Sequence, residues 1–153
     1  MNYIEEKRLI DRIKEAIEKT RRYASFFCWP LDRSTEEYGI VKTFFESAEK
    51  DGIRLFDSDS IVSRGPGKDP PDCEARDYNG NTIGIEVTEL VDQKTIEAVE
   101  KGRLNDWAEW DKDKLIGAIN RLLDKKNVPN KIQGGPYKNY ILLIHTDEPI
   151  LDI

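Results

Sequence analysis

The sequence is poor in the residues on which many catalytic and metal sites depend. Its 153 residues include one histidine, His145, and two cysteines, Cys28 and Cys73. The cysteines have no metal-ligand spacing, and a histidine triad or a histidine metal centre would need partners that the chain lacks. Two cysteines at this length favour a reducing, cytoplasmic setting. We expect His145, which ends an apolar stretch, to be structural.

Long apolar runs are also missing. No stretch approaches the roughly 20 residues of a membrane-spanning helix, and residues 1–22 are charged throughout, without the apolar segment of a signal peptide. We therefore expect no membrane association. The P-loop pattern GxxxxGK[ST] is absent as well, so the glycines and prolines of residues 63–71 predict a turn rather than a phosphate-binding loop.

Charged residues are plentiful, with acids in the majority. The formal net charge is -6, and 35% of the residues are charged against 38% that are hydrophobic. This balance predicts one globular domain, residues 1–153, with its own core. The acidic excess argues against avid, nonspecific DNA binding, which is largely electrostatic, but it leaves room for a locally basic groove.

The most informative stretch is residues 70–88, PPDCEARDYNGNTIGIEVT. It predicts two short strands joined by a hairpin turn. In the second strand, the apolar residues Ile83, Ile85 and Val87 alternate with polar or small ones, so one face should meet the core and the other should carry Glu86.

The length of the turn decides whether Asp72 meets Glu86. A two-residue turn would place Glu86 opposite Cys73, whereas a three-residue loop over residues 78–80 would place it directly opposite Asp72. A three-residue loop favours a left-handed residue at its last position, and Gly80 is there. We therefore predict the three-residue loop, or a bulge with the same effect.

Two facing carboxylates repel each other unless a positive charge lies between them. Oxygen ligands from two carboxylates, a backbone carbonyl and waters suit Mg²⁺ or Mn²⁺. Asp72 and Glu86 therefore predict a site for one of these cations.

At these residues the chain resembles the PD-(D/E)XK nuclease superfamily, which has the restriction-endonuclease-like fold. The family motif is Pro-Asp, a hairpin, then an acid, any residue and a lysine. Pro71-Asp72 and Glu86-Val87 match this motif, and Thr88 stands at the lysine position. The resemblance implies that Asp72, Glu86 and the Val87 carbonyl hold the metal, and that Thr88 positions the attacking water.

The resemblance also implies further site residues. In such enzymes a glutamate from the helix before the sheet often completes the metal site, and Glu37 has that place. The alternative for Glu37 is that it only closes a helix cap. A displaced lysine would supply the missing charge, with the candidates Lys94, Lys101 and Lys125. Candidate phosphate contacts, which could equally be solvated charges, are Arg64 and Lys68, and on one later helix Lys114, Arg121 and Lys125.

Periodicity and turn residues predict the elements of an α/β restriction-endonuclease-like core over residues 35–145, with a helical extension over residues 1–30. The core should consist of a helix, a three-stranded meander that includes the hairpin, a crossover helix and a central strand. The expected helices are 1–24, 34–50, 111–126 and a short one within 89–101. The expected strands are 53–56 (open to extension through 61–62), the hairpin, and 140–145, which is apolar enough to be buried on both faces. For the helix 34–50 we expect a capping box at residues 34–37 and the core residues Val41, Phe44, Phe45 and Ala48.

These features, with the resemblance, predict Mg²⁺- or Mn²⁺-dependent hydrolysis of a phosphodiester in DNA by an endonuclease related to restriction or defence enzymes. The alternative is a catalytically inactive module of the same fold that binds nucleic acid or a protein. Thr88 at the lysine position and an isoelectric point near 5.0 favour that alternative. A third interpretation is a domain whose DNA-reading partner is another chain, so a homodimer or a partner chain is expected to supply specificity.

Overall fold

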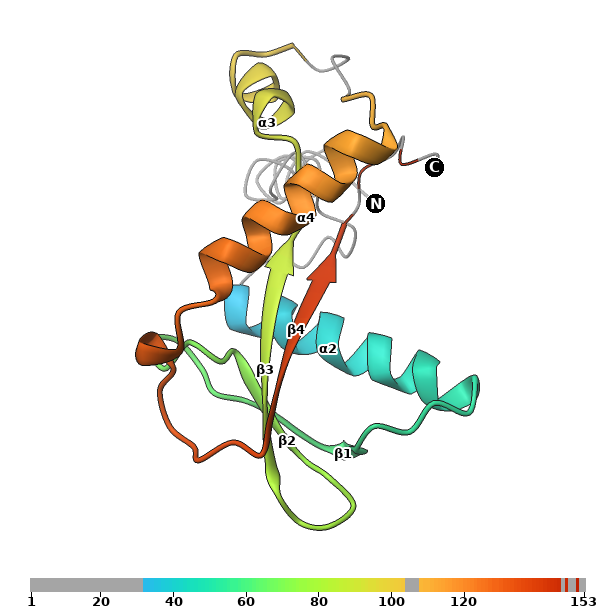
Figure 1. The fold of residues 1–153 in the computed structure, drawn as a ribbon, viewed down its shortest axis with the longest axis vertical. Coiled ribbons are helices and arrows are strands. Elements are labelled where there is room, and N and C mark those ends of the chain that lie inside the picture. The colour runs from blue at the N-terminus through green and yellow to red at the C-terminus, as the bar shows by residue number, and fades with distance from the viewer. Residues whose placement is uncertain (1–31, 104–107, 147, 149–150, 152–153) are drawn as a thin grey trace, which may run out of the picture.

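The computed structural model describes residues 32–103, 108–146, 148 and 151. This part of the chain is a mixed α/β structure with a four-stranded mixed sheet and three α-helices (Figure 1). The α/β class is therefore confirmed. The helix expected over residues 1–24, the extension 1–30 and Cys28 lie outside the described residues. None of the described helices is long and apolar enough to cross a membrane.

The sheet has the order β1-β2-β3-β4, with the strands β1 (Asp57–Ser63), β2 (Cys73–Arg76), β3 (Thr82–Glu89) and β4 (Asn139–His145). The first three strands are antiparallel, and β4 is parallel to β3. Parallel neighbours need a crossover connection, which here contains α3 (Gln93–Glu100), α4 (Lys112–Lys126) and a 3₁₀ turn (Pro129–Lys131). The short helix expected within 89–101 and the crossover helix are confirmed.

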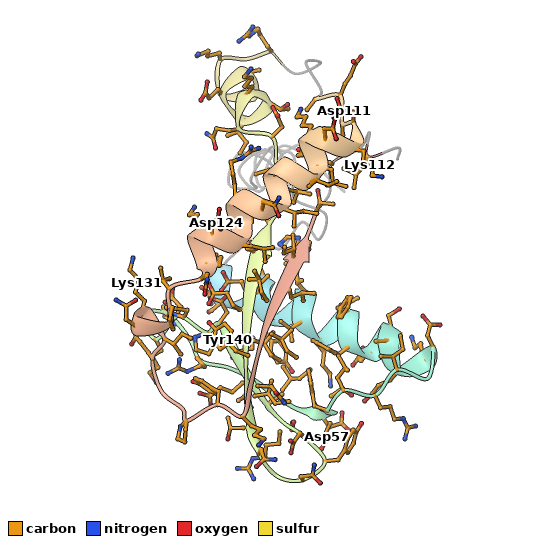
Figure 2. The ribbon with its side chains drawn as sticks, in the orientation of Figure 1. Asp57, Asp111, Lys112, Asp124, Lys131 and Tyr140 are labelled. Atoms are coloured by element: carbon orange, nitrogen blue, oxygen red, sulfur yellow. The ribbon has the colours of Figure 1, made fainter. Side chains whose placement is uncertain are left out.

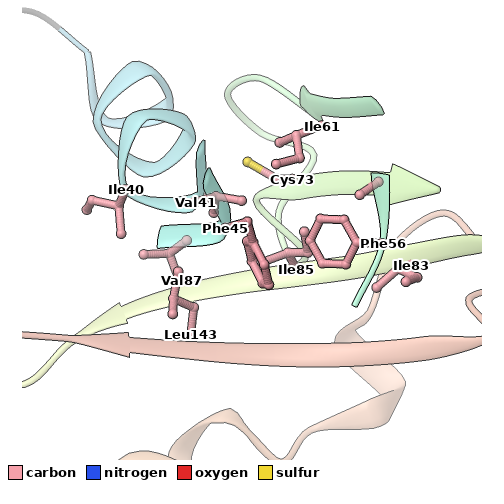
Figure 3. Close-up of a cluster of buried hydrophobic side chains, with 11 residues drawn as sticks. Ile40, Val41, Phe45, Phe56, Ile61, Cys73, Ile83, Ile85, Val87 and Leu143 are labelled. Atoms are coloured by element: carbon pink, nitrogen blue, oxygen red, sulfur yellow. The ribbon is translucent and has the colours of Figure 1, made fainter. Parts of the chain in front are cut away.

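Helix α2 (Arg33–Lys50) covers one face of the sheet. Its buried residues pack against the apolar face of β3, and the rings of Phe45 and Phe56 lie 4.2 Å apart (Figure 3). The alternation predicted for β3 is therefore confirmed. This main core consists of Ile40, Val41, Phe45, Phe56, Ile61, Cys73, Ala75, Ile83, Ile85, Val87 and Leu143.

Helix α4 lies on the opposite face of the sheet from α2 (Figures 1 and 3). Its apolar side packs into a smaller cluster at the ends of β3 and β4, where Leu115, Ala118 and Leu122 join Leu90 and Ile144. The sheet is thus sandwiched between one helix that precedes the hairpin and one that belongs to the crossover.

The start of α2 differs from the prediction. The helix begins at Arg33, and its N-cap is Asp32, whose carboxylate accepts a hydrogen bond from the backbone N–H of Ser34 at 3.3 Å. The predicted capping box at residues 34–37 is therefore wrong, because an acid two residues earlier already occupies the capping position. Glu37 therefore does not close a capping box, which was the alternative role considered for it.

Two apolar assignments were also wrong. Residues 53–56 form no strand: β1 begins at Asp57, and Ile53 and Leu55 are each 55% exposed, although Phe56 is buried. In α2, Phe44 is 49% exposed because its ring packs edge-on against one side of Phe45 and is otherwise open. Ile40, which the prediction left out, is buried instead.

Strand β4 was expected to be buried on both faces, but only Leu143 is fully buried in it. The reason is its position, since β4 is the last strand in the order of the described sheet. Helices cover both of its faces, which accounts for its continuous apolar sequence, while its outer edge leaves the other side chains partly exposed.

Candidate active site

The hairpin between β2 and β3 has the predicted three-residue loop. Asp77 and Asn81 face each other, with the Asp77 N–H donating to the Asn81 carbonyl at 3.0 Å. Gly80 has the left-handed φ of 81° that the last loop position requires. The pairing Cys73↔Ile85 continues the same register. At Asp72 the register shifts, because the Asp72 N–H donates to the Ile85 carbonyl at 3.1 Å. The predicted direct pairing of Asp72 with Glu86 is therefore not continued, although the charge of Glu86 is near enough to raise the pKa of Asp72.

Asp72 lies just beyond the end of β2, at the edge of β3. It is 7% exposed, and its Oδ2 accepts a hydrogen bond from the Val87 N–H at 2.7 Å. The Val87 N–H thus bonds to a side-chain carboxylate rather than to a backbone carbonyl of β2, which begins only at Cys73. Because the N–H and C=O of one strand residue point to the same edge, the Val87 carbonyl also faces the side where Asp72 lies.

Glu86 projects from β3 on the α4 side of the sheet and is 6% exposed. Both of its oxygens have partners: Lys126 forms a close ion pair with Oε1, and the Tyr140 hydroxyl donates to Oε2 at 2.8 Å. A buried carboxylate needs such partners, because an unpaired charge away from water is strongly disfavoured.

Lys126 is the last residue of α4, and it is the lysine that contacts this carboxylate. The sequence-based candidates were Lys94, Lys101 and Lys125, of which Lys125, the immediate neighbour, is exposed. The signal for Lys126 was present in the sequence. It continues the apolar stripe of α4, at steps of four, three and four residues after Leu115, and that stripe faces the sheet.

Tyr140 reaches Glu86 across a glycine, a contact that was not foreseen. Gly84 pairs with Tyr140 in the parallel ladder, and a Cβ on Gly84 would lie 2.9 Å from the ring atom Cδ2. In Figure 2, Tyr140 lies beside β3, below the C-terminal end of α4. A glycine inside a strand often marks such a close approach, so Gly84 was the available signal.

Glu37 approaches Asp72 from α2, on the other side of the sheet. The pKa of Glu37 is raised to about 7: burial is the main cause, Arg33 acts in the opposite direction, and the neighbouring Asp72 carboxylate adds to the rise. The Arg33 Nε lies 2.6 Å from Glu37 Oε1. Glu37 is therefore close to Asp72.

The pKa of Asp72 is also raised. Burial is the main cause, and the charge of Glu86 adds to it, while the Val87 N–H, Lys126 and Arg33 act in the opposite direction. When ionised, the three acids of this group carry three negative charges, against two positive charges on Arg33 and Lys126. The site is thus a buried acidic cluster whose cations do not fully neutralise it.

Two cavities border the cluster. One, of about 210 Å³, is lined by Asp72, Glu37, Arg33 and the glycine-containing loop at residues 65–67. The other, of about 150 Å³, is lined by Glu37, Arg33, Thr88 and His145. Thr88, at the motif-lysine position, therefore lines the same cavity as Glu37 and Arg33. The first cavity gives Asp72 access to solvent.

The predicted phosphate contacts are dispersed. Arg64 is engaged inside the fold: its Nε lies 3.1 Å from Glu74, and it donates to the Gln133 carbonyl at 2.8 Å. Lys68 is exposed in the same loop. Arg121 and Lys94 line a separate hollow between α3 and α4. Arg64 therefore connects the loop after β1 to the loop before β4.

Within the described ranges, no group of three or more His, Cys, Asp or Glu side chains is arranged to hold a metal ion. The candidate ligands are accordingly the two carboxylates of Asp72 and Glu86 and the Val87 carbonyl, a set that Mg²⁺ completes with waters. Comparison of the chain with protein-family models, with curated proteins and with solved structures gave no match.

Proposed function

We propose that the protein is a Mg²⁺- or Mn²⁺-dependent nuclease with a restriction-endonuclease-like core, and that it hydrolyses phosphodiester bonds in DNA. One observation carries this proposal. The hairpin brings Asp72 and Glu86 near each other in buried positions, and Lys126 from the crossover helix is bound to Glu86. Two acids and a lysine at one point are the groups that the family motif assembles.

The donor set fits a hard divalent cation. Asp72 and Glu86 would hold the ion together with the Val87 carbonyl, and Glu37 borders them. The pKa values of Asp72 and Glu37 are raised mainly by burial, and in each case a neighbouring carboxylate adds to the shift, which a bound cation would oppose. When bound, such an ion acidifies a water molecule and neutralises charge that develops on the phosphate.

Lys126 would take the role that the motif assigns to the lysine after the second acid. Its ammonium group comes from α4 rather than from β3, and it holds a proton beside Glu86. There it can donate a hydrogen bond to a phosphoryl oxygen and stabilise the charge that grows in the transition state. Tyr140 would act as a positioning residue, because its hydroxyl fixes the other oxygen of Glu86.

The order of elements also supports this proposal. A helix, three antiparallel strands and a fourth strand that returns in parallel after a helical crossover follow the order of the expected core, although β4 ends the described sheet. Asp72 directly precedes β2 and Glu86 lies on β3, and the two helices supply Glu37 and Lys126.

A second candidate function is a catalytically inactive module of the same fold. Two observations favour it: Thr88 stands at the motif-lysine position, and the protein's own Lys126 and Tyr140 occupy both oxygens of Glu86. In this case Lys126 would be a permanent substitute for the metal, and the surface would bind nucleic acid or a protein without cleaving it.

Calorimetric titration with Mn²⁺, with plasmid nicking measured alongside, tests the proposal. Asp72→Ala and Glu86→Ala should each abolish metal binding and nicking. Lys126→Met should retain metal binding and lower the nicking rate by about 10²-fold or more, as loss of a group that stabilises the transition state does. Lys125→Met, which removes the same charge from the neighbouring exposed position, should behave like the wild type.

The outcomes separate the candidates. Metal binding that is lost in both acid variants, with nicking that depends on Lys126, supports the nuclease. A wild-type protein that binds no Mn²⁺ contradicts the nuclease and favours the inactive module. Equal loss of nicking in Lys125→Met and Lys126→Met would contradict the role given to Lys126.

A further inference from the structure

A hollow of about 850 Å³ lies between α3 and α4, away from the acidic cluster. It is lined by α3 with the residue before it, by Arg103 and Ala108 between the two helices, and by the first three turns of α4. Its positively charged lining residues are Lys94, Arg103, Lys114 and Arg121, and its acidic ones are Asp92 and Glu97. Four cations from separate parts of the chain thus converge on one depression.

The net charge of this hollow has the opposite sign to that of the whole chain. The whole chain has a formal net charge of -6, whereas the lining carries four positive and two negative side chains, a net of +2. Positive charge concentrated in a concave surface raises the local concentration of anions. A polyanion approaching this acidic protein would therefore be drawn to the hollow rather than to the surface as a whole.

Contacts within the protein hold Lys114 in place, whereas Arg121 lies along its own helix. Lys114 Nζ lies 2.9 Å from Asp92 Oδ2 and stands 4.6 Å from the centre of the Trp110 ring. Arg121 lies back over Gly117, since a Cβ on that glycine would be 3.5 Å from one of its guanidinium nitrogens. A positioned guanidinium suits phosphate, whose oxygens it can contact in pairs.

We propose that this hollow binds the phosphate backbone of the nucleic acid at nucleotides that flank the cleavage site. This inference rests on the proposed function, because α4 connects the two places: it carries Arg121 at the hollow and Lys126 at Glu86. Figure 2 shows α4 running from Lys112 at its far end to Asp124 near the site.

The geometry of α4 determines which nucleotides these are. Five residues of helix rise about 7.5 Å, close to two nucleotides of a duplex strand, and they turn the side chain by roughly 140°. A strand that reaches both Lys126 and Arg121 therefore passes over α4. The hollow would accordingly contact flanking phosphates and contribute to substrate affinity, not to the chemical step.

Fluorescence anisotropy with a labelled DNA duplex of mixed sequence, in EDTA to prevent cleavage, tests the inference. The Lys94→Ser/Arg121→Ser variant should bind about 10-fold more weakly than wild type, and the slope of log K against log salt should fall by about 1 to 2, as for one or two lost phosphate contacts. Lys50→Ser/Arg54→Ser removes the same charge at exposed positions at the far end of α2, and it should retain the wild-type slope.

The inference is overturned if both double variants weaken binding equally, if the hollow variant keeps the wild-type slope, or if the wild type does not bind the duplex. Cleavage gives a second measurement: the hollow variant should raise KM for long duplexes and leave kcat unchanged. If nicking depends on metal but the hollow variant keeps the wild-type salt slope, the nuclease proposal stands and the proposal for the hollow is wrong. Binding at the hollow in EDTA without metal-dependent nicking would do the reverse.

Discussion

At the scale of single residues, the candidate site depends on the absence of a side chain at Gly84. The Tyr140 ring lies across the glycine, and its hydroxyl reaches Glu86 at 2.8 Å. A side chain on Gly84 would meet the ring at 2.9 Å and the ring of Pro71 at 3.2 Å. Pro71 precedes Asp72 directly, so this glycine sets the spacing of both halves of the acid pair.

Gly84→Ala should therefore disturb the site through Tyr140. The added methyl group has to displace the ring, and overpacking of this kind costs about 1–3 kcal/mol of the free energy of unfolding. We expect a lower unfolding midpoint in urea and loss of nicking. Tyr140→Phe is the matched control, because it keeps the ring and removes only the hydroxyl. It should retain most of the stability, so unfolding loss in Tyr140→Phe equal to that in Gly84→Ala would contradict the steric explanation.

Glu37 gives the protein a pH-dependent stability in the absence of metal. Its pKa in the folded state, about 7, lies above its ordinary value of 4.5. The folded state therefore binds this proton more tightly than the unfolded state, and the resulting stability is fully present below pH 4.5 and is lost as the pH rises through 7. Glu37→Gln should remove this loss. We expect it to be more stable than wild type at pH 8, by about 1–2 kcal/mol, and to show no such advantage near pH 4.5.

Urea unfolding at the two pH values, in EDTA, measures the difference. Glu46→Gln is the control, because Glu46 is on the same helix but its side chain is 49% exposed. A Glu37→Gln variant whose advantage over wild type is the same at both pH values would show that the effect comes from packing rather than from the charge.

At the scale of elements, the hairpin and α4 show what sequence can and cannot predict. The hairpin register was predictable because local chemistry decides it: a glycine at the last loop position fixes the loop length, and the loop length fixes which residues face each other. The lysine was not found, although Lys126 lies on the apolar stripe of α4. The predicted candidate on this helix, Lys125, belongs to the exposed stripe, and nothing in the charge pattern distinguishes the one lysine that lies on the apolar stripe.

Helix α4 also contains a replaceable glycine. Gly117 is at mid-helix, where glycine is less stable than alanine by roughly 0.5–1 kcal/mol, and a Cβ there would make only an ordinary 3.5 Å contact with Arg121. Gly117→Ala should raise the free energy of unfolding by about that amount. Urea unfolding measures it, and a destabilised variant would show that Arg121 is held more tightly over Gly117 than this contact indicates.

At the scale of the whole molecule, the errors of prediction share a cause. Residues 53–56 have the composition of a strand but no neighbouring strand to pair with, because β2 pairs with β1 only over Asp57–Ser63. Strand β4 has the composition of a central strand, yet the described sheet ends with it. The composition of a strand indicates which of its faces are covered by other elements. Its position in the sheet depends on which strands it pairs with, and that is decided only when the whole fold has formed.

The candidate site also combines two very different distances along the chain. The hydrogen bond from Val87 to Asp72 joins residues 15 positions apart, whereas the ion pair of Glu86 with Lys126 spans 40 positions. Closing the longer loop costs more chain entropy, by somewhat less than about 1 kcal/mol for a flexible chain. The repelling acids therefore meet more readily than the acid and its counter-ion do. Their repulsion is offset only when the crossover has folded, so the burial of charge at this site is completed by a residue 40 positions away from Glu86.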